Sequence, residues 1–430
     1  MGGIIGSGIF MNPSVVARHL HNGTLIMLVW TAGGVLALLG AAVFAELAAR
    51  RPHDGGVYGY ISDAFHPALA FMYGWTLLLV SQSGGMAAAA VTFARYFAPL
   101  TGWQIPSAVV AAAALLFFIG VNALGVRSGA STQNAFMLLK IAAIAGFIAV
   151  GLFAPHAQTA IHAAPAIGGA ALGAIGLSVV PVLFAYNGWQ TSSFVTAELK
   201  DPHVTLPRGM IAGIVCVIVL YLAVNAVCLH ALGVGGLAAT STPASAIAAL
   251  AFGPIGLRIM AIVIALSTLG FLSNQMLVSP RVYFQMAADG TFFKQLASVN
   301  PRTHAPVNAI VLQGLIALAI SFLPYERIIS YVTCVDYIFF GLCAIALVIF
   351  RKRDARDGSR PRPIIRIPGH PVTTLIFLAV AWGVVADVIA TSRETALGIA
   401  ILLSGLPVYW FFKRRNTRVP PTVEVAQETR

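Results

Sequence analysis

The residues at the start of the chain whose types could do chemistry are glycines. Residues 2–10 carry four of them, Gly2, Gly3, Gly6 and Gly8, in an otherwise apolar stretch. Each glycine costs a helix about 1 kcal/mol relative to alanine. Within a bilayer, backbone N–H and C=O groups that lose their helical partners must line a protein cavity. The stretch is therefore either a close-packing face or an interrupted helix that offers backbone groups to a ligand.

Two charged side chains, Lys140 and Asp336, lie deep inside apolar runs. Lys140 lies about ten residues into the run 130–154, or roughly 14 Å from its cytoplasmic end. Asp336 lies about nine residues from Arg327, at the outer end of its own run. A charge at this depth costs a few kcal/mol and indicates function by default. Lys140 is too deep to be a snorkelling lysine, whereas Asp336 could also be a structural partner of a hydroxyl or of Lys140.

These side chains need helices that cross a membrane to position them. Of the 430 residues, 58% are hydrophobic and 9% are charged, whereas soluble proteins carry about 25% charged residues. The sequence therefore predicts an all-α integral membrane protein. A span needs about 20 apolar residues, and the opening stretch with eleven further runs predicts twelve spans. The runs are 24–45, 71–94, 105–126, 130–154, 167–197, 210–229, 259–280, 306–323, 328–350, 371–390 and 396–412.

The distribution of Lys and Arg predicts the orientation. With a cytoplasmic N-terminus, 20 of the 26 lie in inside loops or in the tail and five lie outside, the remaining one being Lys140. Both termini are therefore expected in the cytoplasm, and the basic excess indicates membrane topology and not nucleic-acid binding. We expect the plasma (inner) membrane. Residues 230–256, rich in Gly, Ala, Ser and Thr, are expected to form an outside loop.

The sixth run, 167–197, is longer than a span needs. It holds a polar patch at 184–190 that contains Asn187 and Gly188. Interrupted segments at corresponding positions of two halves are typical of inverted-repeat transporters, which bind their substrate near the bilayer midplane. The alternative is two unrelated clusters of packing glycines.

The cysteines and the known catalytic motifs give little sign of enzyme chemistry. Cys216, Cys228, Cys334 and Cys343 all lie in apolar runs without a C-x-x-C pair, so we expect neither a disulfide-linked subunit nor a metal site. No G-x-S-x-G or H-E-x-x-H motif occurs. We therefore expect no cofactor and no enzymatic activity. Glu46, at the cytoplasmic end of its run, is expected to pair with loop arginines or to cap a helix end.

Several motifs together resemble those of the amino acid–polyamine–organocation superfamily of secondary transporters, and within it the L-type amino-acid transporter-like permeases. They cover nearly the whole chain. The matching segments are 3–10, 44–60, 184–189 (Phe-Ala-Tyr-Asn-Gly-Trp), 198–208, 279–290 and 366–371.

The resemblance implies the leucine-transporter fold, a 5+5 inverted repeat followed by two helices. The first repeat is then 1–154 (spans 1–5) and the second 167–350 (spans 6–10). Spans 11 and 12 occupy 371–412, and 413–430 forms a cytoplasmic tail. Too few residues precede Ser7 to reach the cytoplasm at 1.5 Å per residue, so we expect the first span to be truncated at its N-terminus.

The resemblance also implies a site for a free amino acid between spans 1 and 6. A helix N-terminus presents unpaired N–H groups and a partial positive charge, which suit a carboxylate. The expected carboxylate ligands are the amides of Ser7, Gly8 and Ile9. The expected ammonium ligands are carbonyls near Ile4, Ile5, Phe184 and Ala185.

Side chains on several other spans complete the expected site. Phe184 is expected either to gate the substrate or to be an ordinary packed aromatic. Asn187 and Asp336 are candidates for contact with the substrate side chain, and Asp336 could instead carry a proton. By resemblance, the Lys140 ammonium replaces a sodium ion and bridges span 1 to span 8, where Ser267 and Thr268 are its expected partners.

The sequence thus favours a secondary amino-acid transporter that works by alternating access. It is either a sodium-independent exchanger or a proton symporter, with the bilayer, a free amino acid and, for symport, a proton as its partners. The alternatives are a transporter of a polyamine or another amine-containing solute, and a transporter-like nutrient sensor. A channel is disfavoured because no polar stripe runs through successive spans.

Overall fold

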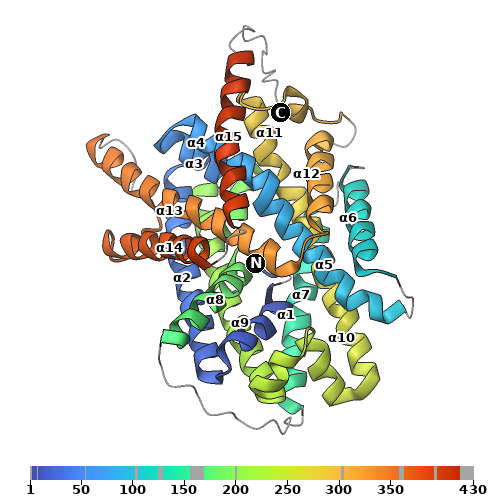
Figure 1. The fold of residues 1–430 in the computed structure, drawn as a ribbon. Coiled ribbons are helices and arrows are strands. Elements are labelled where there is room, and N and C mark those ends of the chain that lie inside the picture. The colour runs from blue at the N-terminus through green and yellow to red at the C-terminus, as the bar shows by residue number, and fades with distance from the viewer. Residues whose placement is uncertain are drawn as a thin grey trace.

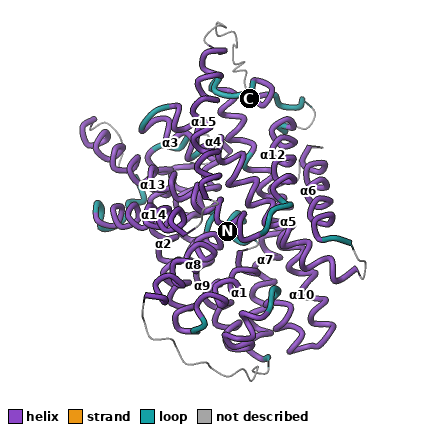
Figure 2. Tube along the Cα trace, in the orientation of Figure 1, coloured by secondary structure: helices purple, strands orange, loops and turns teal. Residues whose placement is uncertain are grey.

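The computed structural model describes most of the chain. The described residues are 2–6, 8–53, 55–101, 105–123, 129–154, 169–198, 201–301, 305–357, 363–391 and 395–416. Over these residues every regular element is a helix (Figure 2). The predicted all-α class is therefore confirmed for the described chain.

Most of the regular structure consists of the α-helices shown in Figure 1. In chain order they are α1 Gly8–Leu20, α2 Gly23–Arg50, α3 Val57–Ala64, α4 Pro67–Thr76, α5 Gln82–Thr101, α6 Ser107–Ala123, α7 Gly129–Phe153, α8 Gly169–Tyr186, α9 Pro202–Ala239, α10 Pro243–Val278, α11 Pro280–Ala288, α12 Val307–Ile320, α13 Tyr325–Asp357, α14 Val372–Thr391 and α15 Thr395–Asn416. A π-helix, Leu77–Ser81, joins α4 to α5, and 3-10 helices span Trp189–Glu198 and Lys294–Ala297.

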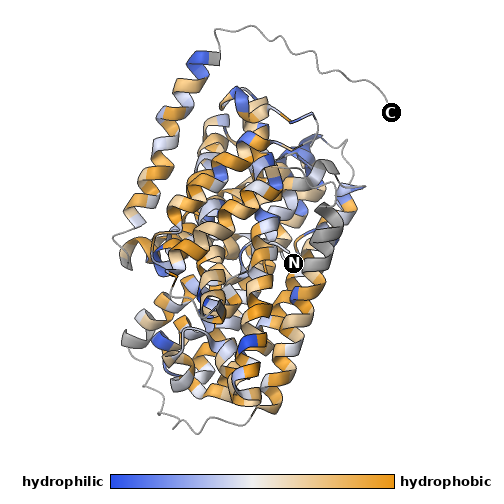
Figure 3. Ribbon diagram, turned by 90° about the vertical axis from the view of Figure 1, so that its right-hand side faces the viewer, coloured by the Kyte–Doolittle hydropathy of each residue, from blue (hydrophilic) through white to orange (hydrophobic). Residues whose placement is uncertain are grey.

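Many of these helices are long and apolar enough to cross a bilayer. Among the described residues seven helical segments meet that description, and the apolar helices at 107–123, 137–153 and 307–320 are shorter. Large apolar side chains such as Phe117, Leu138 and Phe322 are more than half exposed, which is expected where lipid replaces water. Hydrophobic residues cover most of the bundle in Figure 3. The chain is an integral membrane protein.

One expected loop is largely helical. Within 230–256, α9 continues to Ala239 and α10 begins at Pro243, with only Thr240, Ser241 and Thr242 between them. Each helix bends inside this segment at a glycine of positive φ, Gly233 (62°) and Gly253 (61°). The small, uncharged residues that suggested a loop here form short helical turns on either side of those bends.

The packing of the helices brings the beginning of the chain into the middle of the protein. Helix α1 packs against α8 and α9, and α10 packs against α5 and α7. The N-terminal end lies near mid-height of the bundle in Figure 1. The side chain of Ile5 is fully buried. The glycine-rich start of the chain is therefore surrounded by α7, α8, α9 and α10, which can all contribute to a site there.

Candidate functional site

Two helical paths are interrupted at facing positions. Residues 2–6 form turns and bends, and α1 begins at Gly8. On the other side, α8 ends at Tyr186, Asn187 and Gly188 are non-helical, and a 3-10 helix follows. Gly188 has φ 118°, a conformation that favours glycine. Both segments therefore expose backbone groups that a continuous helix would occupy.

The two interruptions approach each other through glycine. A Cβ on Gly8 would lie 2.6 Å from the Cα of Ala185. A Cβ on Gly188 would overlap the carbonyl group of Gly3. Real Cβ atoms do not approach other atoms so closely, so only glycine allows these backbones to meet. The glycines thus allow close packing and also lie at helix interruptions, so both of the alternatives raised by the sequence apply to them.

Lys140 reaches this region from α7. Its Nζ donates to the carbonyl oxygens of Ile5 at 3.1 Å and Gly2 at 3.4 Å. It also lies 5.8 Å from the centre of the Phe271 ring on α10. The lysine is 1% exposed, and a buried ammonium needs such acceptors for its three N–H groups. Lys140 therefore ties α7 to the non-helical start of the chain.

The two hydroxyls on α10 that were expected to bind Lys140 form no hydrogen bond with it among the described residues. Thr268 Oγ1 donates to the carbonyls of Ile264 and Ala265 in its own helix, at 3.1 and 2.9 Å. Ser267 Oγ is buried and has no hydrogen-bond partner among the described residues. The described contact of Lys140 with α10 runs through Phe271.

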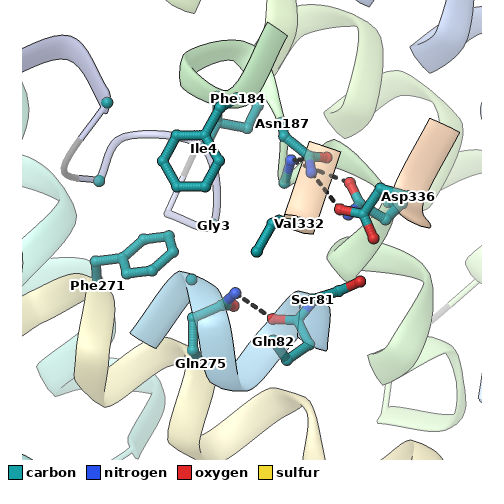
Figure 4. Close-up of a pocket in the computed structure, with 15 residues that line it drawn as sticks. Gly3, Ile4, Ser81, Gln82, Phe184, Asn187, Phe271, Gln275, Val332 and Asp336 are labelled. Carbon is teal, nitrogen blue, oxygen red and sulfur yellow. Dashed lines mark hydrogen bonds between the residues drawn. The ribbon is translucent and has the colours of Figure 1, made fainter. Parts of the chain in front are cut away.

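A small cavity opens between the interruptions and three neighbouring helices (Figure 4). Its walls come from the start of the chain, the beginning of α5 and the residue before it, the end of α8 and the residues after it, the last turns of α10, and the first half of α13. The lining residues are Gly3, Ile4, Gly6, Gly8, Ser81, Gln82, Gly85, Phe184, Asn187, Gly188, Gln190, Phe271, Gln275, Val332 and Asp336. The rings of Phe184 and Phe271 form part of the wall, and amide and carboxyl groups face the remaining space (Figure 4).

Asp336 and Asn187 form a hydrogen-bonded pair in this wall (Figure 4). Asn187 Nδ2 donates to Asp336 Oδ2. Asn187 Oδ1 accepts the N–H of Gly188 at 2.8 Å, which fixes the orientation of the amide. Asp336 is 3% exposed and is the only charged side chain among the residues that line the cavity.

The predicted site residues divide into three groups. Ile4, Gly8, Phe184, Asn187 and Asp336 line the cavity. Ile5, Ile9 and Ala185 are buried beside it. Ser7 lies outside the described residues.

Two of the four carbonyls expected to bind an ammonium, those of Ile4 and Ile5, already accept hydrogen bonds. Ile4 O accepts from the Tyr221 hydroxyl at 3.2 Å, and Ile5 O accepts from Lys140 at 3.1 Å. A carbonyl oxygen has two lone pairs, so each can accept one more hydrogen bond.

The sequence analysis missed a pair of glutamines in the same wall. Gln275 Nε2 on α10 donates to Gln82 Oε1 on α5 (Figure 4). Both side chains are almost fully buried. Uncharged amides inside apolar runs are a weaker signal than Lys140 or Asp336, although burying them also requires partners. The structure gives a second signal that the sequence does not show. The π-helix Leu77–Ser81 directly precedes Gln82, and π-helical turns often mark functional sites.

A polar network covers one side of the cavity. The rings of Phe184 and Tyr325 meet edge to face, with centroids 6.4 Å apart. The Tyr325 hydroxyl donates to Asn12 Oδ1 at 3.1 Å, and Asn12 Nδ2 donates to the carbonyl of Pro181 at 2.5 Å. This network joins α1, α8 and α13.

A second network joins α2, α13 and the segment before α14. Glu46, fully buried, accepts from the guanidinium groups of Arg50 and Arg351 and from the N–H of Ile367. Arg50 also pairs with Asp354 at 2.6 Å. Glu46 thus pairs with arginines as expected from the sequence.

The comparisons with known proteins agree with this arrangement. The amino acid permease family model matches residues 1–411. The serine/threonine exchanger SteT of Bacillus subtilis (strain 168) is 30% identical over 424 residues, which cover 97% of this chain and 95% of the relative. The human b(0,+)-type amino acid transporter 1 is 31% identical over 426 residues, covering 96% and 85%. The human large neutral amino acids transporter small subunit 2 is 29% identical over 436 residues, covering 95% and 78%. The chain therefore belongs to the amino acid permease family, and its resemblance to the L-type-like permeases of the amino acid–polyamine–organocation superfamily is confirmed.

Proposed function

We propose that this protein is a secondary active transporter that moves amino acids across the plasma membrane by alternating access. The observation that carries the proposal is the buried cavity between two facing helix interruptions. Transporter sites near the bilayer midplane are built from such discontinuous helices. The named relatives, a serine/threonine exchanger among them, support the same activity.

The layout proposed for this function is the leucine-transporter fold with twelve spans. The repeats are 1–154 and 167–350, followed by two spans in 371–412 and a tail in 413–430. Both termini face the cytoplasm in this proposal. Its support is the correspondence between the interruption before α1 and the one after α8, because they occupy the first span of each repeat.

The amino acid's main-chain groups bind at the interruptions. The first N–H groups of α1, at Gly8 and Ile9 with Ser7 before them, receive the carboxylate, because a helix N-terminus offers unpaired donors and a positive partial charge. The second lone pairs of the Ile4 and Ile5 carbonyls, with the end of α8, receive the ammonium. Phe184 lies across the cavity wall and closes over the bound substrate.

The transport is sodium-independent in this proposal. The Lys140 ammonium donates hydrogen bonds to the carbonyl oxygens of Gly2 and Ile5. Without the lysine, these oxygens would suit a cation that has lost its hydration shell. Exchange is favoured over proton symport by the name of the exchanger SteT. A polyamine carrier is the second candidate, because Asp336 provides a negative charge in the cavity.

The deciding experiment is counterflow of radiolabelled amino acids into proteoliposomes that contain the purified protein. We expect saturable counterflow, and we expect Gly8→Leu to abolish it, because the new side chain would collide with Ala185. Gly120→Leu is the matched control: Gly120 lies on α6 and has open space around it. Counterflow that survives Gly8→Leu in folded protein would refute the site, and absence of counterflow with all twenty amino acids would refute the function.

A further inference from the structure

We infer that Asp336 and Asn187 form a subsite for a cationic substrate side chain, so that the transported amino acids include those with a side-chain ammonium or guanidinium group. This inference rests on the proposed function and names its substrate class. The observation behind it is an uncompensated carboxyl group in the cavity wall.

The charge of the cavity is unbalanced. Among its lining residues Asp336 alone is charged. Lys140, the one cationic side chain that is buried among the described residues, directs its hydrogen bonds to the carbonyls of Gly2 and Ile5. No salt bridge to Asp336 occurs within the described ranges. A buried carboxylate without a counter-ion is costly, and a zwitterionic amino acid brings no net charge to offset it. A substrate with one extra positive charge does.

The hydrogen bonding of Asp336 leaves it an acceptor. Because Asn187 Oδ1 is held by the Gly188 N–H, the amide must present its N–H groups to Asp336. Asp336 Oδ2 therefore accepts a hydrogen bond from the Asn187 amide. A carboxylate has further acceptor positions on both oxygens, which match the donors of an ammonium or guanidinium group.

The rest of the cavity suits the methylene groups of such a side chain. Val332, one turn before Asp336, and the Phe184 ring line the same space (Figure 4). On α5, a Cβ added to Gly85 would meet only the edge of Phe271, at 4.0 Å. The space is therefore open beside an apolar wall, with the carboxyl group at one side of it.

The subsite and the main-chain site belong to one cavity. Gly8, at the proposed carboxylate site, and Asp336 line the same space. One molecule can thus bind its α-carboxylate at the start of α1 and its side-chain cation on α13. A diamine without an α-carboxylate keeps the cationic contacts and lacks the contact at the start of α1, and this difference separates the proposal from a polyamine carrier.

The test compares pairs of inhibitors that differ in charge and little in shape. Unlabelled lysine and norleucine, and arginine and citrulline, compete against a labelled amino acid in the counterflow assay. We expect the cationic member of each pair to inhibit at a concentration at least tenfold lower. A series from diaminopropionate through ornithine to lysine gives the length at which the cation reaches Asp336, and cadaverine is expected to inhibit weakly.

The matched variants are Asp336→Asn and Asp387→Asn. Asp387 is a carboxyl group on α14 that does not line the cavity. We expect Asp336→Asn to bring the inhibitory concentrations of the two members of each pair together, whatever its overall rate of counterflow, and Asp387→Asn to leave the preference for the cation intact. If Asp336→Asn cannot be purified folded, the wild-type inhibition pairs decide the question alone.

Three results would overturn the inference without touching the proposed function. They are equal inhibition by both members of each pair, a cation preference that survives Asp336→Asn, and uptake of a neutral amino acid driven by a proton gradient and lost in Asp336→Asn. The last result would assign a proton, not a side chain, to Asp336. Absence of any counterflow would instead reject the proposed function itself.

Discussion

Lys140 shows how a single side chain can hold an irregular segment in place. Residues 2–6 have no regular helix, yet the carbonyls of Gly2 and Ile5 have a buried donor in the Lys140 ammonium. Without that donor these groups would face an apolar interior, which costs about 1–3 kcal/mol for each unsatisfied group. The lysine thus places a charge inside the membrane and also holds α7 and the start of the chain together.

We predict that Lys140→Met reduces counterflow at least tenfold. Methionine keeps the approximate length and loses the three donors, so the start of the chain loses its position relative to α8. Lys140→Arg is not expected to restore activity, because a planar guanidinium cannot replace a compact ammonium in a buried site. Counterflow and thermal unfolding in detergent check this. Lys294→Met, at an exposed position, is the control, and normal counterflow by folded Lys140→Met would contradict the prediction.

At the scale of single residues, the sequence predicted which charged residues and glycines lie at the site better than it predicted the uncharged polar residues there. Lys140 and Asp336 stood out because charges are rare in apolar runs, and both lie at or beside the cavity. Gln82 and Gln275 could not be singled out, because an amide on any face of a helix gives the same sequence signal. Their importance depends on which helices adjoin, and only the packing of α5 against α10 brings them together.

At the scale of elements, the contact of α1, α8 and α13 beside the cavity depends on few hydrogen bonds. Asn12 links the Tyr325 hydroxyl to the carbonyl of Pro181. In the proposed transporter a substrate enters and leaves by the separation of helices, so we expect a joint of this kind to influence how long it stays bound.

We predict that Tyr325→Phe speeds substrate release. The ring that packs on Phe184 remains, and the hydrogen bond to Asn12 is lost, which is worth about 0.5–1.5 kcal/mol. The expected result is a roughly two- to tenfold higher half-saturation concentration in counterflow, since each 1.4 kcal/mol is tenfold. Tyr409→Phe on α15 serves as the control. An unchanged half-saturation concentration would show that this joint does not limit release.

The network around Glu46 gives a prediction about stability. Glu46 is the common acceptor of Arg50, Arg351 and the Ile367 N–H. Glu46→Ala therefore removes the acceptor that these three donors share. In Arg351→Ala, Glu46 keeps its other two donors. We therefore expect Glu46→Ala to lower the thermal unfolding temperature more than Arg351→Ala does, because breaking a buried pair costs about 3–5 kcal/mol when a charge is left unpaired. An equal or reversed order in a detergent melting assay would contradict this account.

At the scale of the whole molecule, hydrophobicity predicted where helices lie and gave less information about their shape. Each of the eleven runs is mostly helical in the part of the chain that the structure describes, although 167–197 is interrupted at Asn187 and Gly188. The segment 230–256 was misjudged as a loop, because a sequence rich in small residues fits a loop as well as helical turns. The helices bend there at Gly233 and Gly253, whose positive φ is a conformation that glycine adopts readily and that hydrophobicity does not predict.

The position of Lys140 supports the proposed sodium independence of transport. A sodium ion held between the start of the chain and α10 would need the carbonyl oxygens of Gly2 and Ile5, to which the ammonium already donates. We therefore predict that replacing sodium with choline on both sides of the proteoliposome membrane leaves counterflow unchanged within twofold. The comparison is made with protein in potassium-free buffer, so that no other alkali cation substitutes. Loss of counterflow in choline would mean that sodium binds despite Lys140, and the ammonium would then have to be assigned a purely structural role in holding residues 2–6.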